Sequence, residues 1–138
     1  MRQIFVDTSA WAAITDSKDA NHLAAVKFMQ QIDRKSQLVI TDYILDETYT
    51  LLLMNVGHGP TVRFKQKLDI LRQRGILVVY SVTEAVMTQT WSIFERFNVD
   101  KQWSFTDCVS HVIMRELGIT EVFTFDHHFT QMGFIRLP

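Results

Sequence analysis

Short apolar runs alternate with longer amphipathic stretches along the 138 residues of this chain. The runs are rich in β-branched and aromatic residues, which is typical of buried strands. A run such as 76–80, Ile-Leu-Val-Val-Tyr, also lacks polar alternation, so it predicts a parallel strand covered by helices on both faces. We expect five strands, at residues 4–6, 38–40, 76–80, 122–125 and 134–135.

The stretches between these runs have helical patterns. Between the first two runs, apolar residues recur every three positions among polar ones, which predicts a surface helix that carries Leu23, Val26, Met29 and Ile32. Another helical stretch opens at Thr8, and further helices are expected at residues 42–55, 60–74, 83–97 and 104–117. Gly75 and Gly118 are placed to end two of these helices, because glycine readily adopts the left-handed backbone of a C-terminal cap.

Strands that alternate with helices predict an α/β fold with parallel strand pairing. We expect a three-layer α/β/α sandwich around a central, mostly parallel, twisted sheet of the Rossmann-like kind, formed by a single domain over residues 1–138. In open sheets of this kind, ligands bind beyond the carboxyl ends of the strands. Side chains that follow the predicted strands are therefore the first candidates for chemistry.

The composition agrees with a globular chain, because 47% of the residues are hydrophobic and 21% are charged. The longest apolar runs, at 10–14 and 76–80, reach only five residues, whereas a membrane-spanning helix needs about 20, so we expect no membrane segment. The chain also reaches Asp7 before a signal-peptide core could form, and its single cysteine, Cys108, cannot form an intrachain disulfide. These features predict a cytoplasmic protein.

The formal net charge of −1 does not attract nucleic acid to the molecule as a whole, so a polyanionic partner has to be held locally. Basic residues do cluster between positions 63 and 74, where only Asp69 opposes Arg63, Lys65, Lys67, Arg72 and Arg74. This cluster has two interpretations: a solvated helix face, or a patch that contacts the phosphates of a nucleic acid.

Two aspartates directly follow predicted strands. Asp7 comes after residues 4–6, and Asp126 comes after residues 122–125. Because the carboxyl ends of parallel strands meet at one edge of a sheet, these two carboxylates are expected to approach each other there. Each also has a purely structural explanation, since Asp7 can cap the next helix and Asp126 can form a turn by accepting backbone hydrogen bonds.

Residues 104–107, Ser-Phe-Thr-Asp, match the capping-box pattern at the start of a helix. That pattern alone accounts for both Ser104 and Asp107. A capping acid at a helix start nonetheless also lies at the carboxyl edge of the sheet if its helix leads into the next strand by the usual crossover. The two roles of Asp107 can therefore coexist.

Glu47 lies on the predicted helix 42–55, where its neighbours at i−3, i+4 and i+7 are all apolar: Ile44, Leu51 and Met54. The adjacent Asp46 faces about 100° away, on a more polar side of the helix. An ionised carboxylate on an inward face is costly unless it is paired or coordinates a metal. We therefore select Glu47 as the functional acid, with an ion pair to a nearby Lys or Arg as the alternative.

If the four acids converge, each pair of charges about 4 Å apart repels by roughly 4 kcal/mol at an effective dielectric constant near 20. Protonation or a bound cation has to relieve that repulsion. Hard divalent ions suit ligand sets made of carboxylate oxygens, so Mg²⁺ or Mn²⁺ is the expected cofactor. Such an ion binds a phosphate oxygen and supplies a nucleophilic water, which predicts phosphodiester hydrolysis.

The same residues resemble the PIN-domain ribonucleases, and especially the VapC-type toxins of bacterial toxin–antitoxin pairs. The resemblance covers nearly the whole chain and rests on the order and spacing of four motifs: Ile-Phe-Val-Asp7-Thr8-Ser9, Glu47, Ser104-Phe-Thr106-Asp107 and Phe-Thr-Phe-Asp126-His-His-Phe. It implies a PIN-like fold in which Asp7 and Asp107 are the principal Mg²⁺ ligands, with Glu47 and Asp126 completing the acidic pocket. Ser9, Ser104 and Thr106 would orient ligands or phosphate.

The resemblance further implies a homodimer, a cognate antitoxin that occludes the pocket, and cleavage of structured RNA such as transfer or ribosomal RNA, with messenger RNA a further possible substrate. We assign Glu47 as the base that accepts the proton of the attacking water. The alternative from another class is a non-catalytic RNA-binding or partner-binding module with the same fold. Residues 126–128, Asp-His-His, as a zinc site are set aside, because they lack cysteine partners and a helical His spacing.

Overall fold

The computed structural model describes residues 1–138, and its five strands form one sheet in which every pairing is parallel. The spatial order is β3-β2-β1-β4-β5. The strands are β1 (Gln3–Val6), β2 (Gln37–Thr41), β3 (Leu77–Tyr80), β4 (Glu121–Phe123) and β5 (Ile135–Leu137). The chain therefore leaves the central strand β1 in one direction to β2 and β3, and then returns across the sheet to β4 and β5.

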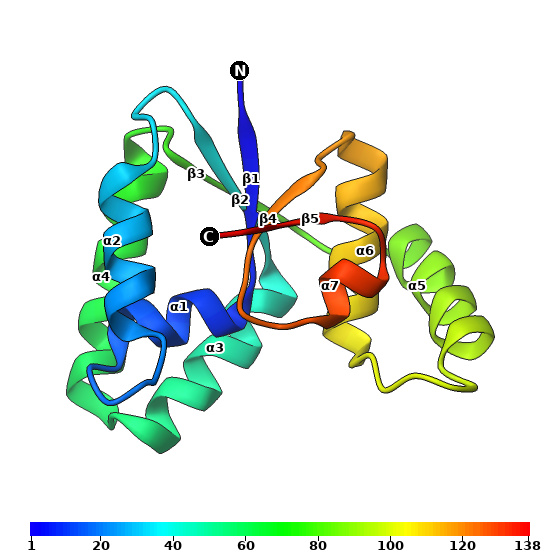
Figure 1. Ribbon diagram of the computed structural model, residues 1–138, viewed down its shortest axis with the longest axis horizontal. Coiled ribbons are helices and arrows are strands. Elements are labelled where there is room, and N and C mark those ends of the chain that lie inside the picture. The colour runs from blue at the N-terminus through cyan, green and yellow to red at the C-terminus, as the bar shows by residue number, and fades with distance from the viewer.

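Seven helices connect these strands: α1 (Thr8–Thr15), α2 (His22–Gln31), α3 (Asp42–Asn55), α4 (His58–Gln73), α5 (Glu84–Phe97), α6 (Phe105–Leu117) and α7 (His128–Gln131). Because crossovers between parallel strands are right-handed, the change of direction after β3 puts the later helices on the opposite face of the sheet. Figure 1 shows α1 to α4 on one side and α5 to α7 on the other. This arrangement confirms the predicted α/β/α sandwich. No helix combines the length and the apolar character that crossing a membrane requires.

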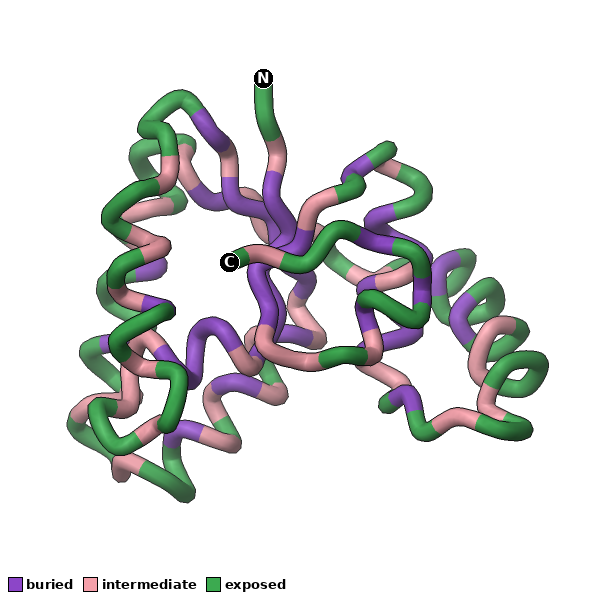
Figure 2. Tube along the Cα trace, viewed as in Figure 1, coloured by how far each residue is buried: buried purple, intermediate pink, exposed green.

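The core lies along the central strands. All three apolar residues of β1, Ile4, Phe5 and Val6, are fully buried, and so are Val122 and Phe123 of the neighbouring β4. The buried segments in Figure 2 accordingly converge on the middle of the sheet. Strands covered on both faces explain why these runs lack polar alternation in the sequence.

The helix predicted from Leu23, Val26, Met29 and Ile32 is present as α2, but its buried face is different. Leu23 is 83% exposed, while Ala25 is fully buried. A spacing of three residues falls about 60° short of a full turn at each step, so position 23 lies on the far side of the helix from position 32. The sequence pattern was right about the element and wrong about one residue on its inner face.

The ends of the last two strands also differ from the prediction. β4 ends at Phe123, so Asp126 lies three residues beyond the strand rather than directly after it. β5 covers residues 135–137 rather than 134–135, and the four-residue helix α7 between these strands was not predicted. A helix of about one turn is too short to produce a recognisable periodic pattern.

Gly118 ends α6 and turns the chain into β4, as predicted. Its φ of 68° is in the left-handed region, and the amide of the next residue, Ile119, donates to the Met114 carbonyl at 2.9 Å. Gly59, in the first turn of α4, has an ordinary helical backbone, and a β-carbon there would meet only the flexible end of Arg63, at 3.4 Å. Gly118 therefore needs a left-handed backbone conformation, whereas Gly59 does not.

Gly118→Ala is expected to lower the free energy of unfolding by about 1–2 kcal/mol, because an L residue pays for the left-handed conformation. Gly59→Ala is expected to be neutral or slightly stabilising, since alanine favours helix. Urea denaturation measures both. Equal losses for the two variants would contradict this account.

Candidate active site

Four acidic side chains from four separate chain segments line one cavity of about 310 Å³. Asp7 joins β1 to α1, Glu47 lies on α3, Asp107 lies in the first turn of α6, and Asp126 lies between β4 and α7. The segments meet at the carboxyl edge of the sheet, toward the lower part of Figure 1. The structure thus brings together all four acids selected from the sequence.

Asp7 serves as the helix cap and as a wall of the cavity at once. It is the N-cap of α1, and its Oδ2 accepts hydrogen bonds from the Ser9 hydroxyl and the Thr124 hydroxyl, both at 2.9 Å. The Ser9 hydroxyl in turn accepts from the amide of Phe125 at 3.0 Å. These bonds tie the end of β1 to the loop that carries Asp126, and they leave Oδ1 of Asp7 without a hydrogen bond.

Asp107, like Asp7, accepts its hydrogen bonds on one carboxylate oxygen and leaves the other without a partner. It forms the predicted capping box, in which its amide donates to the Ser104 hydroxyl at 2.9 Å and its Oδ2 accepts from the Ser104 amide at 3.0 Å. The same Oδ2 lies 3.1 Å from Nδ1 of His128. The capping and functional interpretations of Asp107 are therefore compatible, because its hydrogen bonds end on Oδ2 and Oδ1 stays available.

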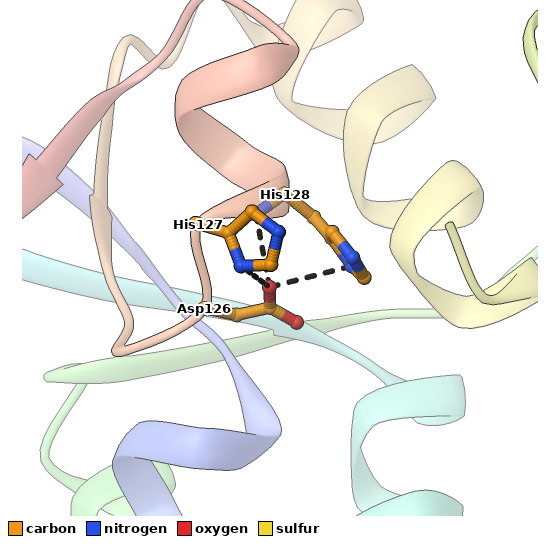
Figure 3. A group of neighbouring side chains, drawn as sticks. All are labelled: Asp126, His127 and His128. Carbon is orange, nitrogen blue, oxygen red and sulfur yellow. Dashed lines mark hydrogen bonds and ion pairs between the residues drawn. The ribbon is translucent and has the colours of Figure 1, made fainter. Parts of the chain in front are cut away.

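His128 is the residue at this site that the sequence did not single out. Figure 3 shows the rings of His127 and His128 beside the Asp126 carboxylate. The backbone amide of His128 donates to Asp126 Oδ1 at 2.9 Å, and its ring Nδ1 lies 3.3 Å from the same oxygen. Since a carboxylate oxygen only accepts, Nδ1 carries the hydrogen when it bonds to Asp107 or Asp126. His128 therefore links two of the four acids, whereas the ring of His127 is 71% exposed.

No local sequence pattern predicts the contact between His128 and Asp107, because His128 lies in the short helix α7. The Asp-His-His run was considered as a zinc site and set aside, because it lacks cysteine partners and a helical His spacing. One ligand atom from each of the three residues does lie within 4.8 Å of the others. The contact between His128 and Asp107 spans 21 residues and depends on how α6 and α7 pack together.

Glu47 faces the cavity, but not for the reason that its apolar neighbours suggested. Ile44 is fully buried, whereas Met54 is 76% exposed, so these residues do not form one inward stripe. The buried positions of α3 are Ile44, Thr48 and Leu52, and Glu47 lies at the side of that face. The neighbouring Asp46 is exposed, as expected.

Crowding and burial shift the proton affinities of three of the acids. Burial, and then the charge of Asp107, raise the pKa of Asp7 to about 7, although the hydroxyls of Thr124 and Ser9 oppose the shift. Burial also raises the pKa of Glu47 and of Asp107, and the charge of Asp126 adds to both shifts. The cavity therefore disfavours the ionised form of these carboxylates, and a bound cation would stabilise that form.

The donor set fits a hard divalent cation. The four candidate ligands are carboxylates, and the hydrogen bonds that fix Asp7 and Asp107 leave one oxygen of each unengaged. Mg²⁺ and Mn²⁺ favour oxygen ligands and are usually held by one or two carboxylates together with water. The arrangement therefore suits Mg²⁺ or Mn²⁺ better than a softer metal that needs thiolate ligands.

The other predicted site residues divide into two groups. Ser9 and Ser104 line the acidic cavity, and the Thr106 hydroxyl lies close enough to Glu47 to lower its pKa. The five basic residues between 63 and 74 lie on α4 or at its end, and none of them lines the cavity. Two of them, Arg63 and Lys67, instead line an apolar groove of about 610 Å³ together with residues of α1 and α2.

Comparison with known proteins places this site in context. Residues 4–135 match the model of the PIN domain family. The chain is 33% identical over 135 residues to the 23S rRNA-specific endonuclease VapC20 of Mycobacterium tuberculosis, a match that covers 97% of each chain. It is also 27% identical over 127 residues to the VapC ribonuclease of Archaeoglobus fulgidus, which covers 91% of this chain and 78% of that one.

Solved structures agree with these matches. The crystal structure of VapC20, described as a toxin that cleaves the sarcin–ricin loop, superposes with a TM-score of 0.85 at 31% identity, over 96% of both chains. The structure of VapBC2 from Rickettsia felis bound to a DNA fragment gives a TM-score of 0.61 at 11% identity, over 98% of this chain and 97% of that one. The second likeness is one of fold alone.

Asp7→Asn is expected to raise the stability of the metal-free protein at pH 8 by up to a few kcal/mol. The pKa of Asp7 is raised from 3.8 in the reference state to about 7 in the folded state, so ionisation progressively costs stability as the pH rises through that interval. Asparagine removes this cost and can still accept the hydrogen bonds of Ser9 and Thr124. The gain is expected to fall to a fraction of a kcal/mol near pH 4, where Asp7 is protonated in the folded wild type and about half protonated in the unfolded chain.

Thermal and urea unfolding in EDTA at the two pH values measure this effect. Asp46→Asn is the matched control, because Asp46 is exposed and its loss should change stability little at either pH. A destabilised Asp7→Asn variant at pH 8 would contradict the crowded-charge account.

Proposed function

The chain belongs to the PIN domain family, and on that basis we propose that it is a metal-dependent endoribonuclease that hydrolyses phosphodiester bonds in RNA as the toxin of a toxin–antitoxin pair. The observation that carries the proposal is the convergence of Asp7, Glu47, Asp107 and Asp126 on one cavity. The names of VapC20 and of the VapC ribonuclease support RNA as the substrate class, and a ribosomal RNA is the favoured target.

In this proposal Asp7 and Asp107 hold Mg²⁺ or Mn²⁺ through their unengaged oxygens, and Glu47 and Asp126 complete the pocket. When bound, such a cation neutralises phosphate charge and lowers the pKa of water. The residues of the chain supply the rest: Ser9, Thr124 and Ser104 fix the carboxylates, so their orientation does not have to be established during the reaction.

Glu47 is the proposed base for the proton of the attacking water. Its raised pKa, caused first by burial, makes it a better proton acceptor than an exposed glutamate, while it remains part of a negatively charged set. It lies on a different element from Asp7 and Asp107, so it can face a water from another side of the cavity. The hydroxyls of Thr8 and Thr106 lie near its carboxylate and oppose the rise in its pKa.

The proposal extends to location and partners. A nuclease that acts on cellular RNA is expected in the cytoplasm, with a cognate antitoxin that closes the acidic cavity. We also propose a homodimer, which is supported by exposed apolar side chains on two helices, Leu53 and Met54 on α3 and Met87 and Trp91 on α5. The two pairs lie on helices at opposite faces of the sheet (Figure 1), so each helix by itself offers a candidate contact surface.

Asp107→Asn is expected to reduce RNA cleavage in Mg²⁺ or Mn²⁺ by at least about 100-fold, because it removes a charge on which both the cation and the reacting phosphate depend. Asp46→Asn is the matched control and should cleave at the wild-type rate. Gel analysis of ribosomal RNA, transfer RNA and a synthetic hairpin measures the effect. RNA binding without cleavage by the wild type would instead favour a non-catalytic RNA-binding module, and equal cleavage by both variants would falsify the acidic site.

His128→Ala is expected to weaken Mn²⁺ binding about 10–100-fold, since residues that orient metal ligands typically contribute that much. His128→Asn should restore affinity to within about threefold, because its amide nitrogen can replace the Nδ1 donor to Asp107. His127→Ala is the control, because that ring is exposed. Titration of Mn²⁺ followed by electron paramagnetic resonance measures affinity independently of cleavage, and an equal loss in the His127 variant would exclude a specific role for His128.

A further inference from the structure

A second cavity, of about 550 Å³, lies among α5, α6, α7 and the segment that joins α5 to α6. Three basic side chains line it, Arg96, Lys101 and Arg115, and none of its lining residues is acidic. We call it the basic pocket. In a chain with a formal net charge of −1, this is a local concentration of positive charge that the overall composition does not suggest.

Each of the three cations is placed over an aromatic ring. Arg96 lies over Phe97 at 5.4 Å from the ring centroid, Lys101 lies over Trp103 at 5.8 Å, and Arg115 lies over Phe134 at 4.9 Å. These are all the cation–π contacts in the structure, so every one of them involves a wall of this pocket. Such contacts favour a defined position for a side chain that would otherwise be mobile, while its hydrogen-bond donors stay available.

The charges of the pocket are largely unneutralised by the protein itself. None of the ion pairs in the structure involves Arg96 or Arg115. Arg115 donates one hydrogen bond, to the carbonyl of Met132 at 3.0 Å. Lys101 lies 3.1 Å from the carboxylate of Asp100, but that side chain is 77% exposed and does not line the pocket. An external anion is therefore the natural partner of these cations.

The segment between α5 and α6 is held in place by hydrogen bonds rather than left as a loose loop. The side chain of Asn98 accepts from the Trp103 amide at 2.9 Å and donates to the Trp103 carbonyl at 2.8 Å. The indole nitrogen of Trp103 donates to the side chain of Gln131 on α7 at 2.8 Å. The walls of the basic pocket are thus formed before any ligand arrives, which lowers the cost of binding.

The basic pocket and the acidic cavity are lined by different residues of the same elements, α6, α7 and the segment before α6. Asp107 and His128 line the acidic cavity, while His111 and Gln131, about one helical turn further along α6 and α7, line the basic pocket. Between Lys101 and Trp103, which line the basic pocket, Gln102 lines the acidic cavity. An extended polyanion that a cation holds at the carboxylates would therefore have the basic pocket beside it.

We propose that the basic pocket binds a backbone phosphate of the RNA next to the one that occupies the acidic cavity, with Arg96 and Lys101 as the contacting cations. This inference rests on the proposed nuclease function and adds a substrate-binding site to it. It also differs from the interpretation in which the basic residues of α4 contact the phosphates of the RNA. Two of those residues, Arg63 and Lys67, line a groove that is mostly apolar, and a third, Lys65, is paired with Asp69. Arg115 has a positioning role here, because its contacts with Met132 and Phe134 fix the far wall.

The test compares two double variants, Arg96→Gln/Lys101→Gln in the basic pocket and Lys65→Gln/Lys67→Gln on α4. Fluorescence anisotropy with a labelled RNA hairpin, in EDTA so that cleavage does not interfere, gives the affinity at several salt concentrations. The first variant is expected to bind at least about tenfold more weakly at 0.1 M salt, with a log–log salt slope smaller by about 1–2, because both cationic contacts to that phosphate are lost. The second should resemble the wild type.

Cleavage kinetics separate binding from chemistry. In Mg²⁺, the first variant should show a raised KM and a kcat within about twofold of the wild type, because its substitutions lie outside the acidic cavity. Unchanged melting temperatures verify that both variants fold. Unchanged RNA affinity in the first variant overturns the proposal, even if the pocket accepts some other anion. A larger loss of RNA affinity in the α4 variant than in the first variant also overturns it. If the wild type binds RNA but cleaves none, the nuclease proposal fails. The anisotropy comparison then still decides whether the basic pocket binds the RNA.

Discussion

The buried carboxylate of Asp7 at the end of the central strand is the group around which the rest of the site is organised. It lies beside a second carboxylate, Asp107, in a setting where burial and repulsion both favour its neutral form. Two hydroxyls hold one of its oxygens, and the parallel pairing of β1 with β4 fixes the loop that follows β4 next to it. If β4 ran antiparallel to β1, Asp126 would lie at the opposite edge of the sheet, and the four acids could not meet.

This arrangement separates charge over a short distance. One cavity at the carboxyl edge concentrates carboxylates, and the neighbouring pocket, across the segment between α5 and α6, concentrates cations. A molecule with almost no net charge can therefore present strong local fields of both signs to a ligand. The hydrogen bonds between Asn98 and Trp103 matter here, because they keep the dividing segment in one conformation.

Features with local causes were predictable from the sequence. The strand before Asp7, the capping box of Ser104 and Asp107 and the terminating Gly118 each depend on a few adjacent residues, and the structure has all of them. The parallel α/β architecture followed from the order of the elements. The sequence pattern placed Glu47 at the site although the exposed Met54 shows that the pattern was not an inward stripe.

Features that depend on tertiary packing could not be predicted in this way. His128 reaches Asp107 only because α7 packs near the start of α6, and α7 itself is too short to have a period. The basic pocket draws its cations from α5, α6 and the segment between them, so no run of the sequence displays it, whereas the continuous run on α4 is conspicuous and lies elsewhere. Conspicuous clusters in a sequence indicate neighbours along the chain, and a binding surface is built from neighbours in space.

Asp7 is both the N-cap of α1 and a wall of the acidic cavity, which bears on how such a chain could change over evolutionary time. Asparagine and serine cap helices about as well as aspartate does, so the capping role at this position survives an exchange that abolishes the negative charge. A descendant that lost its chemistry would therefore have little reason to lose its shape. Asn or Ser at position 7, within an otherwise intact fold, would be the mark of a descendant that is no longer an enzyme.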